Sequence, residues 1–341
     1  MNKILCFLIS LLISANLNAF ATGIEILPTM TTKTNSQDRV WVGTFQLAWN
    51  DFIDKIVFNP IRFREGTPLS VIELNKKEFD IDSLSEDCYY KYTGKIKKNT
   101  KKTIARGLRR TLKETSDILD KLDFEPGNDK FIIYAMLKKD FEFVNAFDKL
   151  GVSNFKKIPT EYFGINEESD KKLLSQGVTV LFYNNPNDFA IKLNTVGNDE
   201  VILYKNSINK PFNFIYSDLL IKQKNYRGKT GLSKADDLKI PNINFFEEKV
   251  FDELIDKRIM GTNLIISQAI ESVKFNLDNK GVQLKSEAGL TAEVTSLLPP
   301  ENIVPRHFYF NNTFIVFIKE KGKKKPYFAL RVNDITKFQA K

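Results

Sequence analysis

The sequence predicts an α+β protein in which early helices are followed by large antiparallel or mixed β-sheets. Apolar residues at helical spacing form the longest runs in the first third of the chain. From Gly177 onward, short apolar or alternating runs separated by turns are typical of strands. No internal repeat or low-complexity linker divides the chain, so we expect residues 20–341 to form one mixed domain.

The first 19 residues have the features of an export signal. Lys3 precedes an apolar or small run at residues 4–15, and small residues between 17 and 21 offer cleavage sites. The run is too short to cross a bilayer, and Cys6 lacks the small-residue surroundings of a lipidation cysteine. We expect cleavage and a secreted or periplasmic mature chain, with a retained anchor as the alternative.

Composition limits the available chemistry. With 42% hydrophobic residues and 28 Phe, the chain can fill a large core. The mature chain keeps one cysteine, Cys88, which cannot form an internal disulfide and is expected to be a half-buried apolar residue. A hydrolase or a zinc site would have to be built on the single histidine, His307, which we expect at the surface where a strand begins. We therefore predict no enzyme, no metal and no cofactor.

The periodicities place individual elements along the chain. Helices are predicted over residues 41–57, 100–122 and 212–222. Residues 131–137 form a continuous apolar run, which is typical of a buried central strand. A meander of three strands is predicted over residues 178–183, 189–193 and 201–204. Residues 238–245 contain Pro241 and therefore predict an edge or bulged strand.

The last hundred residues are richer in strands. Residues 269–277 alternate, residues 276–281 predict a turn, and a second alternating run follows. Strands are also predicted over residues 308–318 and 327–332, joined by the basic turn 321–325.

Residues 282–295 alternate for fourteen positions, longer than the usual strand of five or six. The even positions are apolar or small, and the odd positions are polar or Gly. Pro299 and Pro300 then end any ladder after Leu297 and Leu298, so a strand-patterned segment leads into an exposed loop. An ordinary edge strand followed by a loop has the same pattern.

The neighbouring residues resemble the serpin family. Residues 273–281 are similar to the serpin strand that leads into the reactive-loop hinge. Residues 308–318 and 327–334 resemble the strands that follow the loop, and weaker similarities lie at 237–245, 132–147 and 56–60. The resemblance implies a serpin-like fold with an exposed reactive-centre loop at about 281–305, in a bacterial-type member of the family.

The hinge departs from the family pattern. Inhibitory serpins usually carry Thr and several Ala after the hinge Gly, where this chain has Val282, Leu284, Lys285 and Glu287. Thr313 stands where Pro is common, and the chain is shorter than is typical. A non-inhibitory serpin-like binding or carrier protein is therefore the alternative to an inhibitor.

The resemblance implies inhibition of a serine or cysteine protease by loop cleavage and insertion of the loop into a β-sheet. The family spacing places the cleaved bond within the window Thr295, Ser296, Leu297 and Leu298. On insertion the even face would turn inward, whereas Lys285 and Glu287 would stay in water. The hinge and inserting face comprise Gly281, Val282, Leu284, Ser286, Ala288, Leu290, Ala292 and Val294.

A basic stretch lies between Lys91 and Lys113, with ten Lys or Arg and no Asp or Glu. Six of these residues recur at steps of three and four on one helix face: Lys98, Lys102, Arg106, Arg109, Arg110 and Lys113. This basic row suits a polyanion or an anionic surface, and some serpins use an early basic helix in this way. A solvated face of a Lys-rich protein is the alternative. Sparse aromatic residues argue against nucleic acid, and we expect a monomer.

Overall fold

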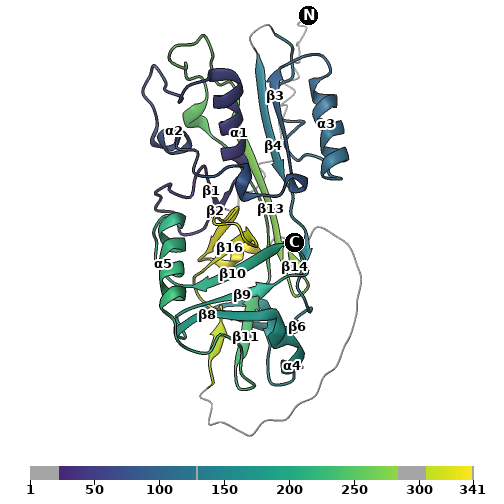
Figure 1. Cartoon of the computed structure of the whole chain (residues 1–341), viewed down its shortest axis with the longest axis vertical. Helices are drawn as coiled ribbons and strands as arrows, with labels where there is room; N and C mark the ends of the chain where they lie inside the picture. The colour runs from purple at the N-terminus through teal and green to yellow at the C-terminus, as the bar shows by residue number, and fades with distance from the viewer. Residues whose placement is uncertain (1–22, 128–129, 283–304, 340–341) are drawn as a thin grey trace, which may run out of the picture.

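The computed structural model describes residues 23–127, 130–282 and 305–339, and its architecture is α+β (Figure 1). Its largest sheet is a mixed sheet of seven strands. The pair β1–β2 is parallel, and all other neighbouring strands in this sheet are antiparallel. In spatial order these strands are β1 (Glu25–Leu27), β2 (Arg39–Val42), β17 (Phe328–Val332), β16 (Phe314–Glu320), β10 (Asp199–Lys205), β9 (Asp188–Asn194) and β8 (Val178–Asn185). The predicted meander is confirmed as β8, β9 and β10.

Three smaller sheets complete the β structure. The first has the order β15 (His307–Tyr309), β11 (Asp237–Pro241), β7 (Ile158–Ile165) and β6 (Asp148–Phe155). The second has the order β12 (Ile243–Val250), β13 (Ile270–Leu277), β14 (Gly281–Val282) and β5 (Phe141–Glu142). The third pairs β3 (Tyr89–Lys95) with β4 (Phe131–Leu137).

The helices lie around these sheets. The main ones are α1 (Thr44–Phe52), which continues as a π-helical turn (Ile53–Val57), α2 (Leu69–Leu74), α3 (Thr100–Thr111), α4 (Lys171–Leu174) and α5 (Phe212–Asn225). Short 3₁₀ turns occupy Ile81–Ser83, Glu86–Cys88, Ser175–Gly177, Asp252–Leu254 and Ile335–Phe338. The helices predicted at 41–57 and 212–222 are confirmed. No helix within the described ranges is long and apolar enough to span a membrane.

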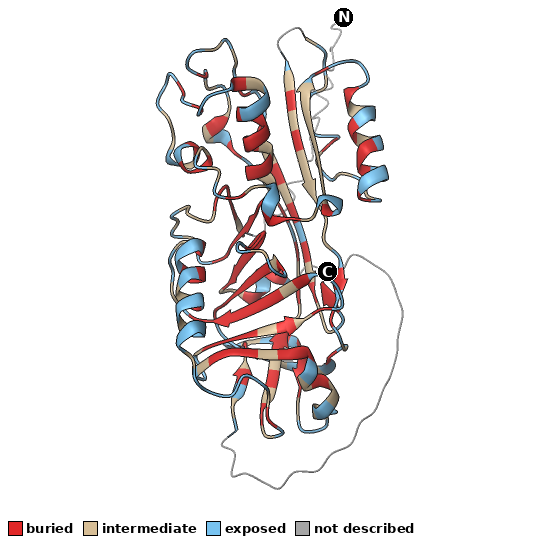
Figure 2. Ribbon diagram, in the orientation of Figure 1, coloured by how far each residue is buried: buried red, intermediate tan, exposed pale blue. Residues whose placement is uncertain are grey.

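Buried apolar side chains form two separate clusters. Figure 2 shows that the strands of the large sheet are mostly buried, whereas α3 and α5 alternate between buried and exposed residues. The larger cluster fills the space between the sheets and α1. The smaller one contains Ile104 and Leu108 from α3, Leu119, and Ile132 and Tyr134 from β4. Because successive strand residues point to opposite faces, β4 presents its even residues to α3 and its odd residues to the main core.

The predicted helix at 100–122 is wrong in its second half. The α3 helix ends at Thr111, and Lys113 has a left-handed backbone with φ 53°. The Ser116 hydroxyl then accepts hydrogen bonds from the Ile118 and Leu119 N–H groups, which replaces helical hydrogen bonding.

Three strand predictions also need correction. Residues 131–137 form a strand that pairs with β3, but that strand is half-buried rather than central. The run 238–245 splits after Pro241 into β11 and β12, and 308–318 splits into β15 and β16. In both places the chain passes from one sheet to another, which a continuous apolar pattern does not reveal.

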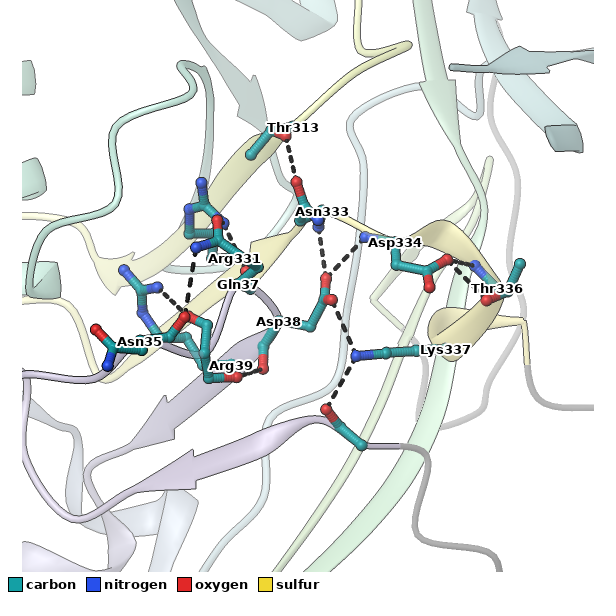
Figure 3. A network of polar contacts seen from close by, with 12 residues as sticks. Asn35, Gln37, Asp38, Arg39, Thr313, Arg331, Asn333, Asp334, Thr336 and Lys337 are labelled. Atoms are coloured by element: carbon teal, nitrogen blue, oxygen red, sulfur yellow. Dashed lines mark hydrogen bonds and ion pairs between the residues drawn. The ribbon is translucent and has the colours of Figure 1, made fainter. Parts of the chain in front are cut away.

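A polar network ties β2 to the chain after β17 (Figure 3). The Asp38 carboxylate accepts hydrogen bonds from the backbone N–H groups of Asn333 (2.6 Å) and Asp334 (2.8 Å) and pairs with Lys337 at 3.1 Å. Thr313 donates its hydroxyl to the Asn333 side chain at 2.9 Å. The network fixes the closing strand of the large sheet against its N-terminal partner.

Candidate functional site

The short strand β14 lies between two other strands. Val282 is opposite Leu277 of β13 on one side and Phe141 of β5 on the other, and both pairings are antiparallel. Val282 and Leu277 are both buried, so the Val282 side chain points inward. The chain enters the space between β13 and β5 before the described residues end.

Gly281 occupies the point where β14 passes closest to β5. A Cβ atom at this position would lie 2.3 Å from the Phe141 carbonyl oxygen and 2.8 Å from the Glu142 Cα. Both of these atoms belong to the backbone and cannot rotate away, so the position requires glycine. The presence of glycine at position 281 therefore has a local structural cause.

Beyond β14 and β5, the two strands β4 and β13 run side by side (Figure 1). Within the described part of the chain, no ladder joins β4 to β13. A cavity of about 530 Å³ lies between them and is lined by residues 130–138 on one side and 263–272 on the other. We call this space the β4–β13 cleft. Ile133, Ala135 and Leu137 of β4 stay half-buried beside it.

The inner side of the cleft is closed by α1. Its Phe45, Trp49 and Phe52 line the cavity, and the Phe45 ring packs on the Phe251 ring at 4.2 Å. Thr44 and Ala48 add small side chains to the same lining. This apolar surface faces the odd residues of β4 and β13, which is the side of the main core.

One inward-facing residue of β13, Glu271, has an ionisable side chain. Glu271 is 4% exposed, and neither carboxylate oxygen has a partner with hydrogen-bond geometry within the described structure. Burial raises the pKa of Glu271 to about 8, and the nearby Phe45 N–H and Lys249 only partly oppose this shift. At neutral pH the side chain is therefore mainly a neutral acid at the edge of the cleft.

The outer side of the cleft is crossed by residues 114–123, which we call the strap. Ile118 and Leu122 of the strap line the cavity and pack against the α3 cluster. On the β4 side, Tyr134 donates its hydroxyl to Ser116 at 2.9 Å and Lys138 pairs with Glu114 at 3.1 Å.

The strap is also attached across the cleft. Lys121 forms an ion pair with Glu248 of β12, and the Asp123 N–H donates to the Gln268 side chain at 2.8 Å. Glu114 has a lowered pKa, because the Thr115 N–H, and then Lys138 and Lys274, favour its charged form. The strap thus joins the two sides of the cleft by polar contacts that are separate from its apolar packing.

The described residues resume at Pro305, and the next residue, Arg306, is held by several polar contacts. The Arg306 guanidinium pairs with Asp236 at 2.8 Å and donates to the Lys229 and Gly231 carbonyl oxygens. Burial opposes this charge, but the Asp236 carboxylate outweighs it and raises the pKa of Arg306. The next residues, His307–Tyr309, pair in parallel with β11. Val282 and His307, the nearest strand residues on the two sides of residues 283–304, therefore belong to two different sheets.

Most of the predicted inserting face and cleavage window lies outside the described residues. This applies to Leu284, Ser286, Ala288, Leu290, Ala292, Val294 and to Thr295, Ser296, Leu297 and Leu298. Only Gly281 and Val282 of that set are placed, where they form β14, and their role as a hinge stays a prediction.

The remaining candidates are all placed. His307 begins β15 and its side chain is 47% exposed, as predicted. Cys88 is more buried than predicted, and burial raises the pKa of its thiol to about 12, so the thiol is unreactive. No group of three His, Cys, Asp or Glu suited to a metal occurs in the described ranges.

The basic row lies on and beside α3. Lys98 precedes the helix, Lys113 follows it, and all six side chains are exposed. The row occupies the face of α3 opposite Ile104 and Leu108, which are fully buried. The helical spacing predicted for these residues is therefore observed, although the helix is shorter than expected.

Three features of the site were missed by sequence reasoning. Glu271 gives a usable signal, because it shares odd parity with Val273, Phe275 and Leu277 on an otherwise apolar face. Arg306 gives no local signal, since its partner Asp236 is 70 residues away. The strap is hidden by the apparent helical spacing of its leucines.

No family model matches the chain, and no curated protein matches it. Among solved structures the chain is similar to Serpin48 of the insect Tenebrio molitor, described as a highly specific serpin, with 16% identity and a TM-score of 0.46 over 89% of this chain and 94% of that one. It is also similar to thyroxine-binding globulin in complex with thyroxine, with 10% identity and a TM-score of 0.44 over 88% and 93%. A structure of human thyroxine-binding globulin is 12% identical, with a TM-score of 0.41 over 77% of this chain and 84% of that one. Identities this low leave the function to be inferred from the chain's own residues.

Proposed function

We propose that this chain is an exported, serpin-type protease inhibitor that acts as a suicide substrate. One observation carries the proposal: Gly281 and Val282 already form a strand between β13 and β5, and the β4–β13 cleft lies between the same two sides. A segment with strand alternation follows directly in the sequence. The segment that would fill the cleft therefore begins directly after the strand that leads into it.

The register of β14 predicts how the segment would insert. With Val282 opposite Leu277, continuation of the same antiparallel ladder would put residue 284 opposite Phe275 and residue 286 opposite Val273. Both of these β13 residues are buried in the main core. The even face of the segment would therefore turn toward the core, as the alternation requires.

The free energy of insertion would come from two sources. Burying Leu284, Leu290 and Val294 contributes roughly 1.5–3 kcal/mol for each side chain. A new strand would also supply hydrogen-bond partners to the facing edges of β4 and β13, as in other cases of strand addition. The uncleaved protein would then be metastable and held by a kinetic barrier.

The inhibitory step is a diverted cleavage. The protease's nucleophilic oxygen or sulfur attacks the carbonyl carbon of a peptide bond within the window 295–298. The peptide bond breaks, and the amino group of the following Ser or Leu leaves with the proton that the nucleophile gives up. The acyl-enzyme remains attached to the inserting side of the loop. Insertion then carries the protease along the sheet before water can hydrolyse the ester or thioester.

Two measurements test the proposal. Incubation with elastase-, chymotrypsin- and subtilisin-like serine proteases should give a covalent complex that survives denaturant. Cleavage of the loop between Thr295 and Leu298 by any protease should raise the melting temperature by more than about 10 °C, since several kcal/mol are gained. Cleavage with neither a covalent complex nor a rise in melting temperature would reject the proposal.

A non-inhibitory serpin-like binding or carrier protein is the second candidate. In the β14 register Lys285 would lie opposite Lys274 on the strap side, and this like-charge pair opposes insertion. Glu114, which Lys274 helps to keep charged, is the carboxylate that would offset it. Loop cleavage with a higher melting temperature but no covalent complex would favour this candidate.

A further inference from the structure

The cavity in the β4–β13 cleft has an unsatisfied carboxyl group in its wall. Glu271 lines this cavity and is 4% exposed, and neither carboxylate oxygen has a hydrogen-bond partner among the residues that the structure describes. A buried carboxyl group without partners is unfavourable, because it has lost its water and gained no hydrogen bond in exchange. Such a group at a cavity wall is a candidate anchor for the polar end of a ligand.

The Glu271 carboxyl group lies on the inner side of the cavity, beside the first turn of α1. Two groups favour its charged form, the Phe45 N–H of α1 and Lys249 of β12. The Lys249 ammonium group is engaged elsewhere, because it donates to the Ile26 carbonyl oxygen at 3.0 Å and lies 5.0 Å from the centre of the Phe251 ring. Glu271 is therefore left without a cation that bonds to it directly.

The other charged residues of the lining belong to the strap, to β4 with the residue before it, and to the outward face of β13. Glu114 pairs with Lys138 at 3.1 Å, and Asp123 pairs with Lys130 at 3.1 Å. The remaining members of this set are Asp117 and Lys274. These groups surround the outer opening of the cavity, whereas Glu271 is the acid of its inner wall.

The surroundings of the carboxyl group are aromatic and apolar. The Phe45 and Trp49 rings are stacked with their centres 6.5 Å apart, and the edge of Trp49 meets Phe52 at 6.2 Å. Ile133 and Leu137 of β4 add aliphatic surface to the same lining. The volume of about 530 Å³ lies within the range of roughly 300–1,000 Å³ in which proteins commonly bind small ligands.

Insertion of the alternating segment would not satisfy Glu271. Continuing the register that places Val282 opposite Leu277 would put residue 288 opposite Glu271. Residue 288 is an alanine, and its methyl group can neither donate nor accept a hydrogen bond. The carboxyl group is therefore a feature of the cavity that the proposed inhibitory function does not use.

We propose that the β4–β13 cleft binds an apolar primary amine, whose ammonium group pairs with the Glu271 carboxylate while its hydrocarbon part contacts α1 and β4. A primary ammonium group has three N–H donors, enough to serve both carboxylate oxygens. The faces of the Phe45 and Trp49 rings also favour a cation. A carboxylic acid would instead bring a like charge, and a quaternary ammonium ion would bring no N–H donor. This ligand is additional to the loop that the proposed function assigns to the cleft.

Amine binding should be coupled to loss of a proton from Glu271. Burial raises the pKa of Glu271 to about 8, whereas an alkyl ammonium group keeps its proton to about pH 10. Between about pH 6 and pH 8 the association constant should therefore rise about tenfold per pH unit, with one proton released for each amine bound. His307, the single histidine of the chain, begins β15 in a different sheet and lies outside the cavity lining.

The test is a calorimetric titration of the uncleaved mature protein with decylamine, a straight-chain primary amine, at about pH 8 and without protease. Glu271→Gln keeps the shape of the side chain, and it should weaken binding at least about tenfold and abolish proton release. The matched control is Asp117→Asn, which removes an exposed carboxylate of the strap from the same lining and should keep the affinity within about twofold. Ala48→Leu narrows the cavity beside α1 and should also weaken binding.

Several results would overturn the proposal. They are the absence of decylamine binding, equal affinity of the native protein and Glu271→Gln, a comparable loss in Asp117→Asn, and no change in Ala48→Leu. Equal affinity for decanol would mean apolar binding alone, and tighter binding of decanoate would reject a cationic ligand. Circular dichroism of each variant separates loss of the site from loss of the fold. Because no protease or loop cleavage is involved, the outcome is independent of the test of inhibition.

Discussion

Val282 lies directly opposite Leu277 across β14 and β13, and both side chains are buried. This pair fixes the parity of everything that would follow in the same ladder, because the side-chain period of a strand is two residues. Even residues would point to the main core, and odd residues would point toward the strap. Insertion into the β4–β13 cleft would depend on this relationship and on the residues that surround the cleft.

The parity can be tested with adjacent substitutions. Leu290→Asp would put a carboxylate on the inward face, where burial without a partner costs several kcal/mol, so the yield of covalent protease complex should fall more than tenfold. Thr291→Asp is the matched control on the outward face and should largely preserve the yield. Both yields are measured on denaturing gels. Equal behaviour of the two variants would contradict the parity.

Trp49 should report insertion without any label. Its side chain lines the cleft, whereas the other tryptophan, Trp41, is buried beside Phe79 in the large sheet at a ring distance of 5.4 Å. Loop cleavage should shift the emission maximum of Trp49, because insertion would place new side chains beside an indole that is already only 4% exposed and would change its packing. Trp49→Phe should abolish the shift, and Trp41→Phe should keep it. A shift that depends on Trp41 instead would place the change away from the cleft.

The strap should slow insertion, because its contacts with the far side of the cleft oppose separation of β4 from β13. The variant Lys121→Ala/Gln268→Ala removes one half-exposed ion pair and one hydrogen bond. Together these are worth about 1 kcal/mol, so the insertion rate after cleavage should rise roughly fivefold. The rate is followed through Trp49 fluorescence in stopped flow.

A matched control for the strap is Lys192→Ala, which removes a comparable ion pair to Glu200 in the large sheet. This variant should insert at the native rate. If the strap variant also inserts at the native rate, the strap does not limit the opening of the cleft.

Glu271 should make the folded state less stable as pH rises. Its folded pKa is about 8 against an ordinary value of 4.5, so between these values the unfolded chain binds fewer protons than the native one. The contribution of the neutral Glu271 carboxyl to the free energy of unfolding is fully present below pH 4.5 and is lost as pH rises to about 8. The loss is on the order of 1 kcal/mol per pH unit at most.

The isosteric variant Glu271→Gln removes this titration. It should match the native protein in urea denaturation near pH 4.5 and exceed it in stability at pH 8. The difference should grow across that interval and then level off. A constant difference across the pH range would show that Glu271 does not titrate between these limits.

Many elements of the fold could be predicted from local hydrophobic patterns in the sequence. Periodicity located α1, α5, β13 and the meander β8–β10, because each element buries one face against a continuous core. The turn before Gly281 and the strand character of residues 308–318 and 327–332 were also visible. The parity of residues 282–295 could be read because alternation in a strand needs no knowledge of its neighbours.

Other features depend on contacts between distant segments. The apolar run 131–137 predicts a central strand, yet only the assembled sheets show that β4 borders a cleft. The strap has helical spacing, but Lys113 and Ser116 end the helix and the strap instead crosses to Glu248 and Gln268. A continuous strand pattern cannot show that Pro241 marks a change of sheet.

The sequence by itself determined the composition of the site: an alternating segment, a glycine before it, prolines after it and a basic row on one helix. The tertiary structure decided where that segment begins, between β13 and β5, and that a cleft closed by α1 and crossed by the strap lies ahead of it. The physical reason is that side-chain periodicity is a local property, whereas a space between two strands is set by residues more than a hundred positions apart.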